Sequence, residues 1–289
     1  MTYEEISFDF QCGKRLLRFS ERTHIMGVLN VTPDSFSDGG KYLDPERAVD
    51  RAHEMVSQGA DIIDVGGESS RPKGPYGEGA EIVSDDEEIG RVVPVIERIA
   101  GSSDVPISID TYKSTVAEAA LHAGASIVND ISGLTHDPLM ASVIAKHRGA
   151  LIAMHMKGTP KTMQADPQYG DVVREVKSGL ADSVKSARWA GIEHILIDPG
   201  IGFGKNIGHN LTLIRHLGEF RSLGCPIVIG PSRKAFIGTL LNSPVGDRLE
   251  GTAAAVAAAI IAGANVVRVH DVREMKRVAI VADAVLRAT

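Results

Sequence analysis

The run "VVRVH" (266–270) joins a strand pattern to two polar side chains. Its β-branched residues, and the small residues before them, are typical of a buried parallel strand. Because side chains alternate along a strand, Arg268 and His270 point to one face, and Val267 and Val269 point to the other. A core strand that ends in an arginine and a histidine, two cationic residue types, requires something that offsets their charge.

Seven further β-branched runs precede this one, with amphipathic segments between them. They are "HIMGVLN" (24–30), "ADIIDVGG" (60–67), "VPISID" (105–110), "SIVND" (126–130), "ALIAMH" (150–155), "HILIDPG" (194–200) and "PIVIGPS" (226–232). Eight strands that alternate with helices predict a (β/α)8 TIM barrel, and the 289 residues are predicted to form one domain, 1–289. A doubly wound open sheet is the main alternative, but the strand count and the lack of GxGxxG after the first strand favour the barrel.

Local signals place other elements. Asp44-Pro45 predicts a helix start, with the aspartate as N-cap and the proline in the first helical position. Ser84 and Glu87 fit a capping box, but Pro94 lies inside the helix that this box would begin, so the helix is either kinked or begins later. The segment "ISFDFQCGKRLLRF" (6–19) alternates around a turn and predicts a hairpin that closes the bottom of the barrel.

Composition narrows the function. With 31 basic and 37 acidic residues, the net charge is −6, which argues against binding to nucleic acid or a membrane surface. Cys12 and Cys225 are far apart and outside any CxxC motif, so neither a disulfide framework nor a thiolate metal site is predicted. The ten histidines contain no HxxxH pair with a carboxylate at metal-site spacing, and no zinc site is predicted. The first residues lack the pattern of a secretory signal, and we expect a cytoplasmic protein.

Almost every predicted strand ends in a polar or ionisable residue. These residues are Asn30, Asp64, Asp110, Asn129, Asp130, His155, Asp198, Ser232, Arg268 and His270. In a barrel the strand ends converge on one mouth, together with the Gly-, Pro- and Ser-rich segments 30–44 and 66–81, which we predict to be mobile loops. A single aspartate or asparagine at a strand end is more often a turn former or helix cap, and Asp64 and Asp130 are interpreted in this way. His155 is interpreted as a loop residue rather than a metal ligand.

The chemistry of these side chains indicates a ligand with two different ends. Asp110, Asn129 and Asp198 can satisfy the N–H groups of a flat heterocycle, and Lys234 can donate to a ring carbonyl. On the opposite side, donors for an anion are predicted, with the Asn30 carbonyl as an oxygen ligand for Mg²⁺. These donors are Arg268, His270, Asn30 and Arg71. A heterocycle at one end and a phosphate at the other describe an activated pterin-like substrate.

At these motifs the sequence closely resembles the dihydropteroate synthase family over nearly its whole length. The matching phrases are "MGVLNVTPDSFSDGG" (26–40), "DIIDVGGESSRP" (61–72), "ISIDT" (107–111), "IVNDISG" (127–133), "MHMKGTPKTMQ" (154–164), "DPGIGFGK" (198–205), "SRKAFIG" (232–238) and "RVHDV" (268–272). The resemblance implies a TIM barrel that joins 6-hydroxymethyl-7,8-dihydropterin diphosphate to p-aminobenzoate, with Mg²⁺ assistance and a dissociative displacement of diphosphate. It also implies a homodimer.

The resemblance assigns residues to three subsites. The residues that would bind the pterin are Asp110, Asn129, Asp198, Lys234 and Met154. Those that would bind the diphosphate are Arg268, His270, Asn30 and Arg71. The p-aminobenzoate subsite would contain Phe36, Ser70, Arg71, Pro72, Phe203, Ser232 and Lys234, and Asp38 belongs to a catalytic loop. Many family members read "ESTRP" where this chain has Ser70, which keeps the hydroxyl and loses a methyl group.

Two alternatives stay open. A pterin-binding methyltransferase module would cradle the same ring, but it needs no diphosphate clamp and lacks the "SRP" and "SRK" loops that are present here. A non-catalytic pterin-binding paralogue would lack chemical residues, whereas every such position is filled in this chain.

Overall fold

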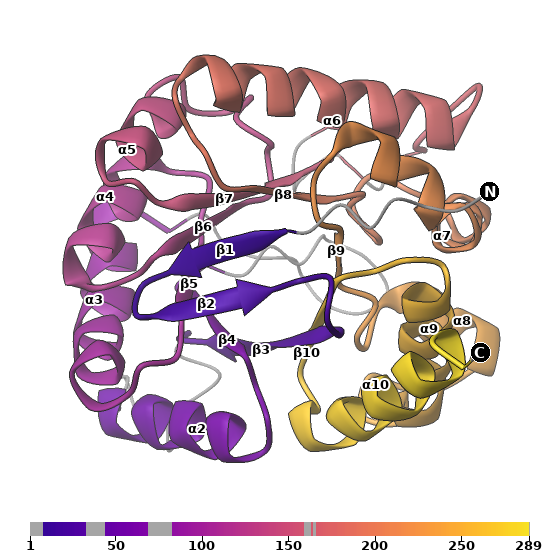
Figure 1. Ribbon diagram of the computed structural model, residues 1–289, viewed down its shortest axis with the longest axis horizontal. Coiled ribbons are helices and arrows are strands. Elements are labelled where there is room, and N and C mark those ends of the chain that lie inside the picture. Colours follow the sequence, from indigo (N-terminus) through magenta and orange to yellow (C-terminus); the bar gives the residue numbers. More distant parts are fainter. Residues whose placement is uncertain (1–7, 33–43, 69–82, 159–162, 164–165, 289) are drawn as a thin grey trace.

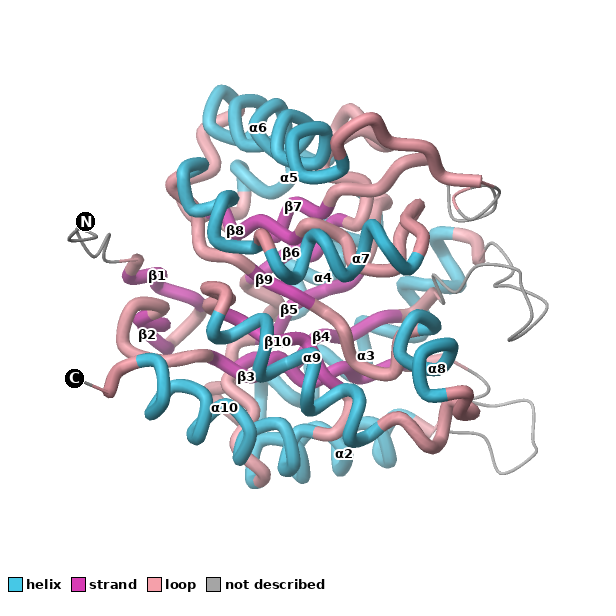
Figure 2. Tube along the Cα trace, turned by 90° about the vertical axis from the view of Figure 1, so that its right-hand side faces the viewer, coloured by secondary structure: helices cyan, strands magenta, loops and turns pink. Residues whose placement is uncertain are grey.

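The structure is a computed structural model that describes residues 8–32, 44–68, 83–158, 163 and 166–288. Parallel strands form its centre and helices surround them (Figures 1 and 2). The strands of the central sheet are β3 (His24–Asn30), β4 (Ile62–Gly66), β5 (Ile107–Asp110), β6 (Ile127–Asp130), β7 (Ala150–Met154), β8 (Ile195–Asp198), β9 (Val228–Ile229) and β10 (Val266–Val269). Each lies within a run that the sequence analysis predicted.

The sheet closes almost completely on itself. Its strand order is β8-β7-β6-β5-β4-β3-β10-β9, and its two ends meet through a parallel bridge between Ile197 and Ile227. This confirms the predicted TIM barrel over the open sheet. β9 is shorter than predicted because Pro226 and Pro231, which flank it, have no backbone N–H to donate to a neighbouring strand.

Helices form the outer ring. They are α2 (Pro45–Ser57), α3 (Asp85–Ser102), α4 (Ser114–Ala123), α5 (Met140–Lys146), α6 (Val172–Trp189), α7 (Ile207–Arg215), the 3-10 helix η1 (Leu217–Leu223), α8 (Ala235–Leu241), α9 (Leu249–Ile261) and α10 (Val272–Leu286). The main core lies between this ring and the outer faces of the strands, and it includes Val267 and Val269, as the alternation predicted. In the described ranges, no helix has both the length and the apolar character of a membrane span.

Two helix starts follow the sequence signals. The side chain of Asp44 accepts a hydrogen bond from the backbone N–H of Glu46, and Pro45 opens α2. Ser84 caps α3 by accepting from the N–H of Glu87. The alternative that this helix begins later is wrong, since α3 runs through Pro94 without a break. Four acidic residues in its first turn favour the helix dipole, and its buried apolar face outweighs the hydrogen bond lost at the proline.

A hairpin of β1 (Asp9–Cys12) and β2 (Arg15–Arg18) covers one end of the barrel (Figure 1). Gly13, with φ +58°, occupies the turn in a conformation that favours glycine. Apolar side chains of the hairpin and of the barrel strands together form a second core cluster. This cluster contains Phe10, Cys12, Leu17, Phe19, Met26, Ile62, Ile127, Ala150, Ile152, Leu196, Val228 and Val266. The predicted bottom closure is confirmed, so the opposite, carboxyl ends of the strands form the mouth.

Candidate active site

Four of the polar strand-end residues line one pocket at the mouth; they are Asp110, Asn129, Asp198 and Arg268. Its empty volume, with the open entrance included, is about 330 Å³. The residues that line it are Asp110, Asn129, Ile131, Met154, Asp198, Ile201, Phe203, Gly230, Lys234 and Arg268. The structure therefore brings together side chains from β5, β6, β7, β8 and β10 and from the turns that follow β8 and β9.

Arg268 lies between two carboxylates inside the barrel. Its Nε is 2.6 Å from Oδ2 of Asp64, and its Nη2 is 2.5 Å from Oδ2 of Asp110. Arg268 was predicted on the side opposite the heterocycle acceptors, whereas in the structure it lies among them. The reason is the barrel itself: only β4 and β3 separate β5 from β10 in the closed sheet, and both strands contribute side chains to the interior.

Asp64 is the main residue that the sequence analysis misjudged. It is not a turn former: it lies inside β4, it is fully buried, and its Oδ2 also accepts from Nδ2 of Asn129 at 3.3 Å. Its Oδ1 has no hydrogen-bond partner among the described residues. Alternation within "IIDVG" could have revealed this, since it places Asp64 on the inward face of the strand. Asp130, by contrast, is a turn former, and its carboxylate accepts from Ser132 and Leu134.

Burial and crowding of like charges tune the ionisable groups. Burial raises the pKa of Asp110, the guanidinium of Arg268 opposes that rise, and the nearby carboxylate of Asp64 adds to it. Burial likewise raises the pKa of Asp198, although the N–H of Gly200 donates to its Oδ1 at 2.7 Å. Burial, together with the charge of Arg268, lowers the pKa of Lys234 to about 8. Such perturbed groups in one pocket indicate a functional site.

Lys234 also contacts an aromatic ring. Its Nζ lies 4.1 Å from the centre of the Phe203 ring, and Phe203 packs with Ile131, Met154 and Met163 in a small cluster at the mouth. Met154 is thus both core and pocket lining, as expected. The flat apolar wall and the charged amine beside it form a surface that suits the face of an aromatic ligand.

His270 lies just beyond the end of β10. Its Nδ1 is 3.0 Å from Oγ of Ser232, and its backbone N–H donates to the same oxygen. Burial, followed by the charges of Arg268 and Arg233, lowers the pKa of His270 to about 3. The interpretation of two cationic side chains was therefore wrong for the free protein: His270 is neutral near pH 7, because a second charge beside Arg268 would be costly.

Asn30 ends β3 beside the same carboxylates. A side chain at Gly66 would come within 3.8 Å of both Oδ1 of Asn30 and Oδ2 of Asp110, so glycine leaves a space between these oxygens. The donor set around that space is made of oxygen atoms, the ligand type that Mg²⁺ prefers. Oδ1 of Asn30 therefore fits a magnesium ion as a ligand, whereas Oδ2 of Asp110 is bound to Arg268 in this structure.

Comparison with known proteins gives a consistent result. The pterin binding enzyme family matches residues 26–270. The dihydropteroate synthase of Bacillus subtilis (strain 168) is 49% identical over 272 residues, which are 93% of this chain and 91% of the relative. This chain belongs to the dihydropteroate synthase family. It is therefore a transferase, as predicted, and the methyltransferase module and the non-catalytic paralogue are not favoured.

Solved structures of the dihydropteroate synthase family share the whole fold. The Xanthomonas albilineans enzyme with 4-aminobenzoic acid gives a TM-score of 0.89 at 40% identity, over 98% of this chain and 100% of the other. The dihydropteroate synthase of that organism in complex with 7,8-dihydropteroate gives 0.85 at 37% identity, over 98% and 100% of the two chains.

Several residues that the family resemblance assigned lie outside the described residues. These residues are Phe36, Asp38, Ser70, Arg71 and Pro72. The segment that carries the last three lies between Glu68 and Val83, and both of these contact the ammonium of Lys113: Nζ donates to Oε2 of Glu68 and to the carbonyl of Val83, each at 2.6 Å.

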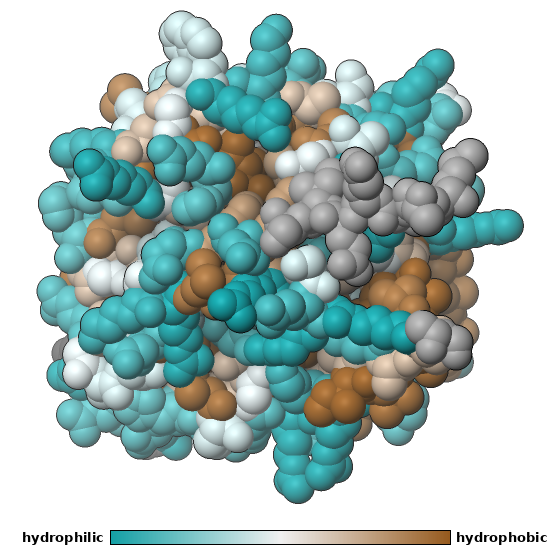
Figure 3. All heavy atoms as spheres, viewed as in Figure 1, coloured by the Kyte–Doolittle hydropathy of each residue, from teal (hydrophilic) through white to brown (hydrophobic). Residues whose placement is uncertain are grey.

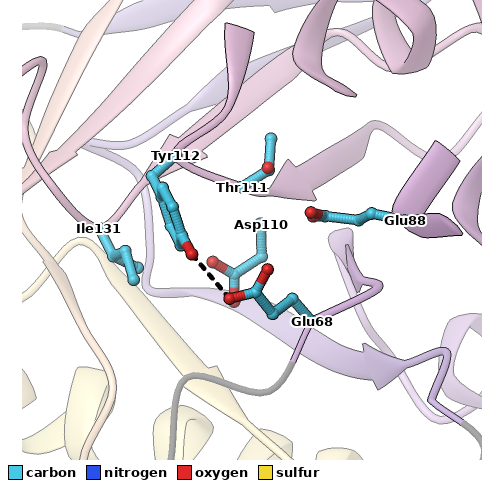
Figure 4. A pocket seen from close by; sticks show the side chains of 6 residues that line it. All are labelled: Glu68, Glu88, Asp110, Thr111, Tyr112 and Ile131. Atoms are coloured by element: carbon cyan, nitrogen blue, oxygen red, sulfur yellow. Dashed lines mark hydrogen bonds between the residues drawn. The ribbon is translucent and has the colours of Figure 1, made fainter. Parts of the chain in front are cut away.

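A second small pocket adjoins the first beside Asp110 (Figure 4). Figure 4 shows Tyr112 pointing toward Glu68, and its Oη donates to Oε1 of Glu68 at 2.7 Å. Lys113 also donates to Glu88, which is buried in α3. Sequence analysis missed this network. Its central residues, Tyr112 and Lys113, follow the motif "ISIDT" (107–111), and no local pattern pairs them with Glu68.

Sequence analysis also gave no role to Lys205, the last residue of the dihydropteroate synthase motif "DPGIGFGK". Only 2% of it is exposed, and its Nζ donates to the carbonyls of Phe203 at 2.9 Å and of His155 at 3.2 Å. Burial lowers the pKa of Lys205 to about 7. His155 is a loop residue, as interpreted, and its carbonyl would be 2.0 Å from a Cβ at Gly200 (φ +71°), so only glycine fits there.

Proposed function

We propose that this pocket binds the pterin ring of 6-hydroxymethyl-7,8-dihydropterin diphosphate, and that the enzyme joins it to p-aminobenzoate with release of diphosphate. The observation that carries the proposal is the group of acceptors Asp110, Asn129 and Asp198, which line one pocket with Lys234. The buried carboxylate of Asp64 adjoins this group through its contacts with Asn129 and Arg268. Structures of Xanthomonas albilineans dihydropteroate synthase contain 4-aminobenzoic acid and 7,8-dihydropteroate, the nucleophile and the product of this reaction.

Hydrogen bonds from the heterocycle offset the free-energy cost of burying these carboxylates away from water. An amino-pyrimidine edge presents several N–H groups in one plane, and Oδ1 of Asp64 has no partner among the described residues. Asp198 uses Oδ1 for Gly200, and we assign its other oxygen to the ring. Asp110 and Asn129 complete the edge, Lys234 donates to the ring carbonyl, and Met154 and Phe203 contact the ring faces.

Arg268 changes partners in this proposal. In the structure its guanidinium is bound to Asp64 and Asp110. When ring N–H groups replace it on these carboxylates, the long side chain is released to the diphosphate, with Asn30 and His270 beside it and Arg71 as a further donor. Burial and, after it, the neighbouring cations keep the imidazole of His270 neutral; a diphosphate beside it opposes the effect of those cations, so binding of the substrate raises the pKa of His270.

The chemistry needs charge stabilisation more than a strong base. Carbon–oxygen cleavage at the methylene leaves positive charge that the electron-rich ring spreads, and negative charge grows on the departing diphosphate. Asp110 and Asp198 stabilise the cation, and Arg268 stabilises the anion. The neutral arylamine then attacks and loses its proton, so positioning and exclusion of water matter most. Phe203, Ser232 and Lys234 border the amine side.

Mg²⁺ is part of the proposal. Oδ1 of Asn30 would hold it, next to the space that Gly66 leaves. When bound, it would supply positive charge to the diphosphate oxygens. Titration of turnover with Mg²⁺, before and after removal of divalent ions with a chelator, tests this assignment; full activity in the chelated protein would contradict it.

The assembly is proposed to be a homodimer formed through barrel helices. Exposed apolar side chains gather on the helices after β9 and β10, and Figure 3 shows the hydrophobic surface at that side. They are Leu240, Leu241, Val245, Leu249, Ile261, Ile280, Val281, Val285 and Leu286. A patch of this kind indicates a protein interface. Light scattering on the purified protein should give twice the chain mass of 30.8 kDa; a monomer at micromolar concentration would contradict the dimer.

The partners in this proposal are small molecules, and the location is cytoplasmic. Cys12 and Cys225 are both buried free thiols, which suits a reducing compartment. Fractionation of cells that produce the protein at natural levels tests the location. A secreted or membrane-bound majority would contradict it.

Turnover is the direct test of the function. Purified protein with the pterin diphosphate, p-aminobenzoate and Mg²⁺ should release diphosphate and form dihydropteroate. The matched control is Asp198→Asn, which should fold and lose the reaction. Pterin binding without turnover would indicate the non-catalytic paralogue, and methyl transfer to a corrinoid protein would indicate the methyltransferase module.

A further inference from the structure

Three potential metal ligands meet on the outer ring, away from the pocket. Glu118 and His122 lie four residues apart on α4, so they share one face of that helix. His147 follows the last residue of α5, the neighbouring helix (Figure 1). One ligand atom from each residue lies within 4.8 Å of the other two. The sequence analysis predicted no zinc site, and it missed this group because β6, the loop after it and α5 separate His122 from His147.

The group lies at the end of the barrel opposite the mouth. Helices of this fold run antiparallel to the strands, and the ends of α4 and α5 lead into the first residues of β6 and β7. The mouth is formed by the other ends of these strands. A metal ion at the group would therefore be distinct from the magnesium ion proposed at Asn30.

His147 supplies the independent sign that a ligand is missing. Its side chain is 15% exposed, and its Nε2 is buried with no hydrogen-bond partner among the described residues. The nearest carboxylate oxygen, Oε1 of Glu118, is 3.6 Å away, which is too long for a hydrogen bond. A buried imidazole nitrogen without a partner is costly in a purely structural role.

The spacing suits a tetrahedral ion. Zinc bonds to nitrogen and oxygen of about 2.0–2.1 Å place two ligand atoms roughly 3.4 Å apart. The separation of 3.6 Å between Nε2 of His147 and Oε1 of Glu118 is already close to this value. The His122 ring, whose centre is 4.4 Å from that of His147, is exposed and free to turn its nitrogen inward.

We propose that Glu118, His122 and His147 form a binding site for a divalent transition-metal ion of the zinc class. Two imidazoles and one carboxylate leave the fourth position to water. Imidazole ligands favour zinc-class ions over Mg²⁺, so the magnesium of the reaction does not compete. Bound metal links the end of α4 to the end of α5 and stabilises the folded chain by mass action.

Lys146 modulates the site. Its Nζ is 2.7 Å from Oε1 of Glu118, the oxygen nearest His147. The ammonium therefore competes with a metal ion for the carboxylate. Removal of this charge by Lys146→Gln should raise the affinity for Zn²⁺ several-fold, whereas unchanged affinity would exclude Glu118 as a ligand.

Zinc binding to the tag-free protein tests the proposal. Equilibrium dialysis against micromolar Zn²⁺ should give one ion per chain, and Zn²⁺ should raise the melting temperature by several degrees. His122→Gln and His147→Gln should each weaken binding at least about tenfold, since loss of even an outer partner of a metal site costs about 10–100-fold. Both variants should keep full synthase activity, because neither residue lines the pocket.

The matched control is His53→Gln, which removes another exposed histidine, on α2. It should bind Zn²⁺ as the unmodified protein does. Equal binding by all three histidine variants, or no zinc bound by the unmodified protein, would overturn the proposal. Co²⁺ as a second probe should show the absorbance of a four-coordinate ion, and an octahedral spectrum would also contradict it.

Discussion

Arg268 and Asp64 meet inside the barrel, with 2.6 Å between Nε of the arginine and Oδ2 of the carboxylate. Asp64 is fully buried, Arg268 is 19% exposed, and Asp110 lies 2.5 Å from Nη2 of the same guanidinium. One cation therefore serves two buried carboxylates. Asp198 and Lys234 line the same pocket and balance each other in charge. Arg268 is therefore engaged in the free protein, and it becomes available to an anion only after ring N–H donors have replaced it on the carboxylates of Asp64 and Asp110.

Arg268→Ala should remove catalysis more than ring binding. Loss of a donor to the developing negative charge costs about 10²–10³ in kcat. The affinity for a pterin without phosphate should stay largely intact, because the ring contacts other side chains. Steady-state kinetics and calorimetry measure the two quantities; equal losses in both would contradict the separate roles.

The same variant should change the pH dependence of the reaction. The guanidinium opposes the rise in the pKa of Asp110, so its removal raises that pKa further. In the proposed mode of binding, Asp110 accepts ring N–H groups as a carboxylate, and we expect activity to be lost as the pH falls through its pKa. The acidic limb of kcat/KM should therefore move to higher pH in Arg268→Ala and less in Arg268→Lys, which keeps a charge.

Sequence alone predicts the frame of this protein well. The β-branched runs locate the strands because a parallel barrel buries both faces of each strand. Convergence of strand ends then brings Asp110, Asn129, Asp198, Lys234 and Arg268 into one pocket without any long-range information. Polar residues at strand ends are enough to predict the shared pocket, because the fold determines where the strand ends meet.

What sequence could not supply is pairing across the barrel. Arg268 contacts carboxylates 204 and 158 residues earlier in the chain, and nothing local indicates which ones. Asp64 is a different case, since alternation along its strand places it on the inward face, but a turn role was preferred for a lone aspartate. The neutral state of His270 depends on burial and on neighbouring cations, which appear only in three dimensions.

The neutral state of His270 should make folding stability depend on pH. Its pKa is lowered to about 3 in the folded chain, against about 6.5 when unfolded, so the stabilisation is present above pH 6.5 and is lost as the pH falls toward 3. His270→Asn should reduce the slope of unfolding free energy against pH by up to about 1.4 kcal/mol per pH unit in that window. Urea unfolding at several pH values measures it, and an unchanged slope would show that His270 is protonated in the fold.

Tyr112→Phe should weaken the binding of p-aminobenzoate without unfolding the protein. The change removes the hydrogen bond from Oη to Glu68, which immediately precedes the segment that carries Ser70 and Pro72. A single neutral donor to a carboxylate is worth about 1.5–3 kcal/mol, so a rise of at least several-fold in KM for p-aminobenzoate is expected. KM for the pterin diphosphate is the internal control, and an equal rise in both would contradict a role on one side only.

Lys205→Met should destabilise the protein and loosen the pocket. The substitution keeps an unbranched side chain that is one atom shorter, and it removes the donor to the carbonyls of Phe203 and His155. Each buried carbonyl left unpaired costs about 1–3 kcal/mol, and relief of the buried charge, whose pKa is lowered to about 7, recovers part of that cost. We expect a net loss of about 1–3 kcal/mol in urea unfolding at pH 7, together with weaker pterin binding, since Phe203 lines the pocket. Lys14→Met removes an exposed ion pair and should cost less than about 1 kcal/mol. If Lys205→Met were as stable as the unmodified protein, relief of the buried charge would outweigh the hydrogen bonds, and the structural role of this lysine would be wrong.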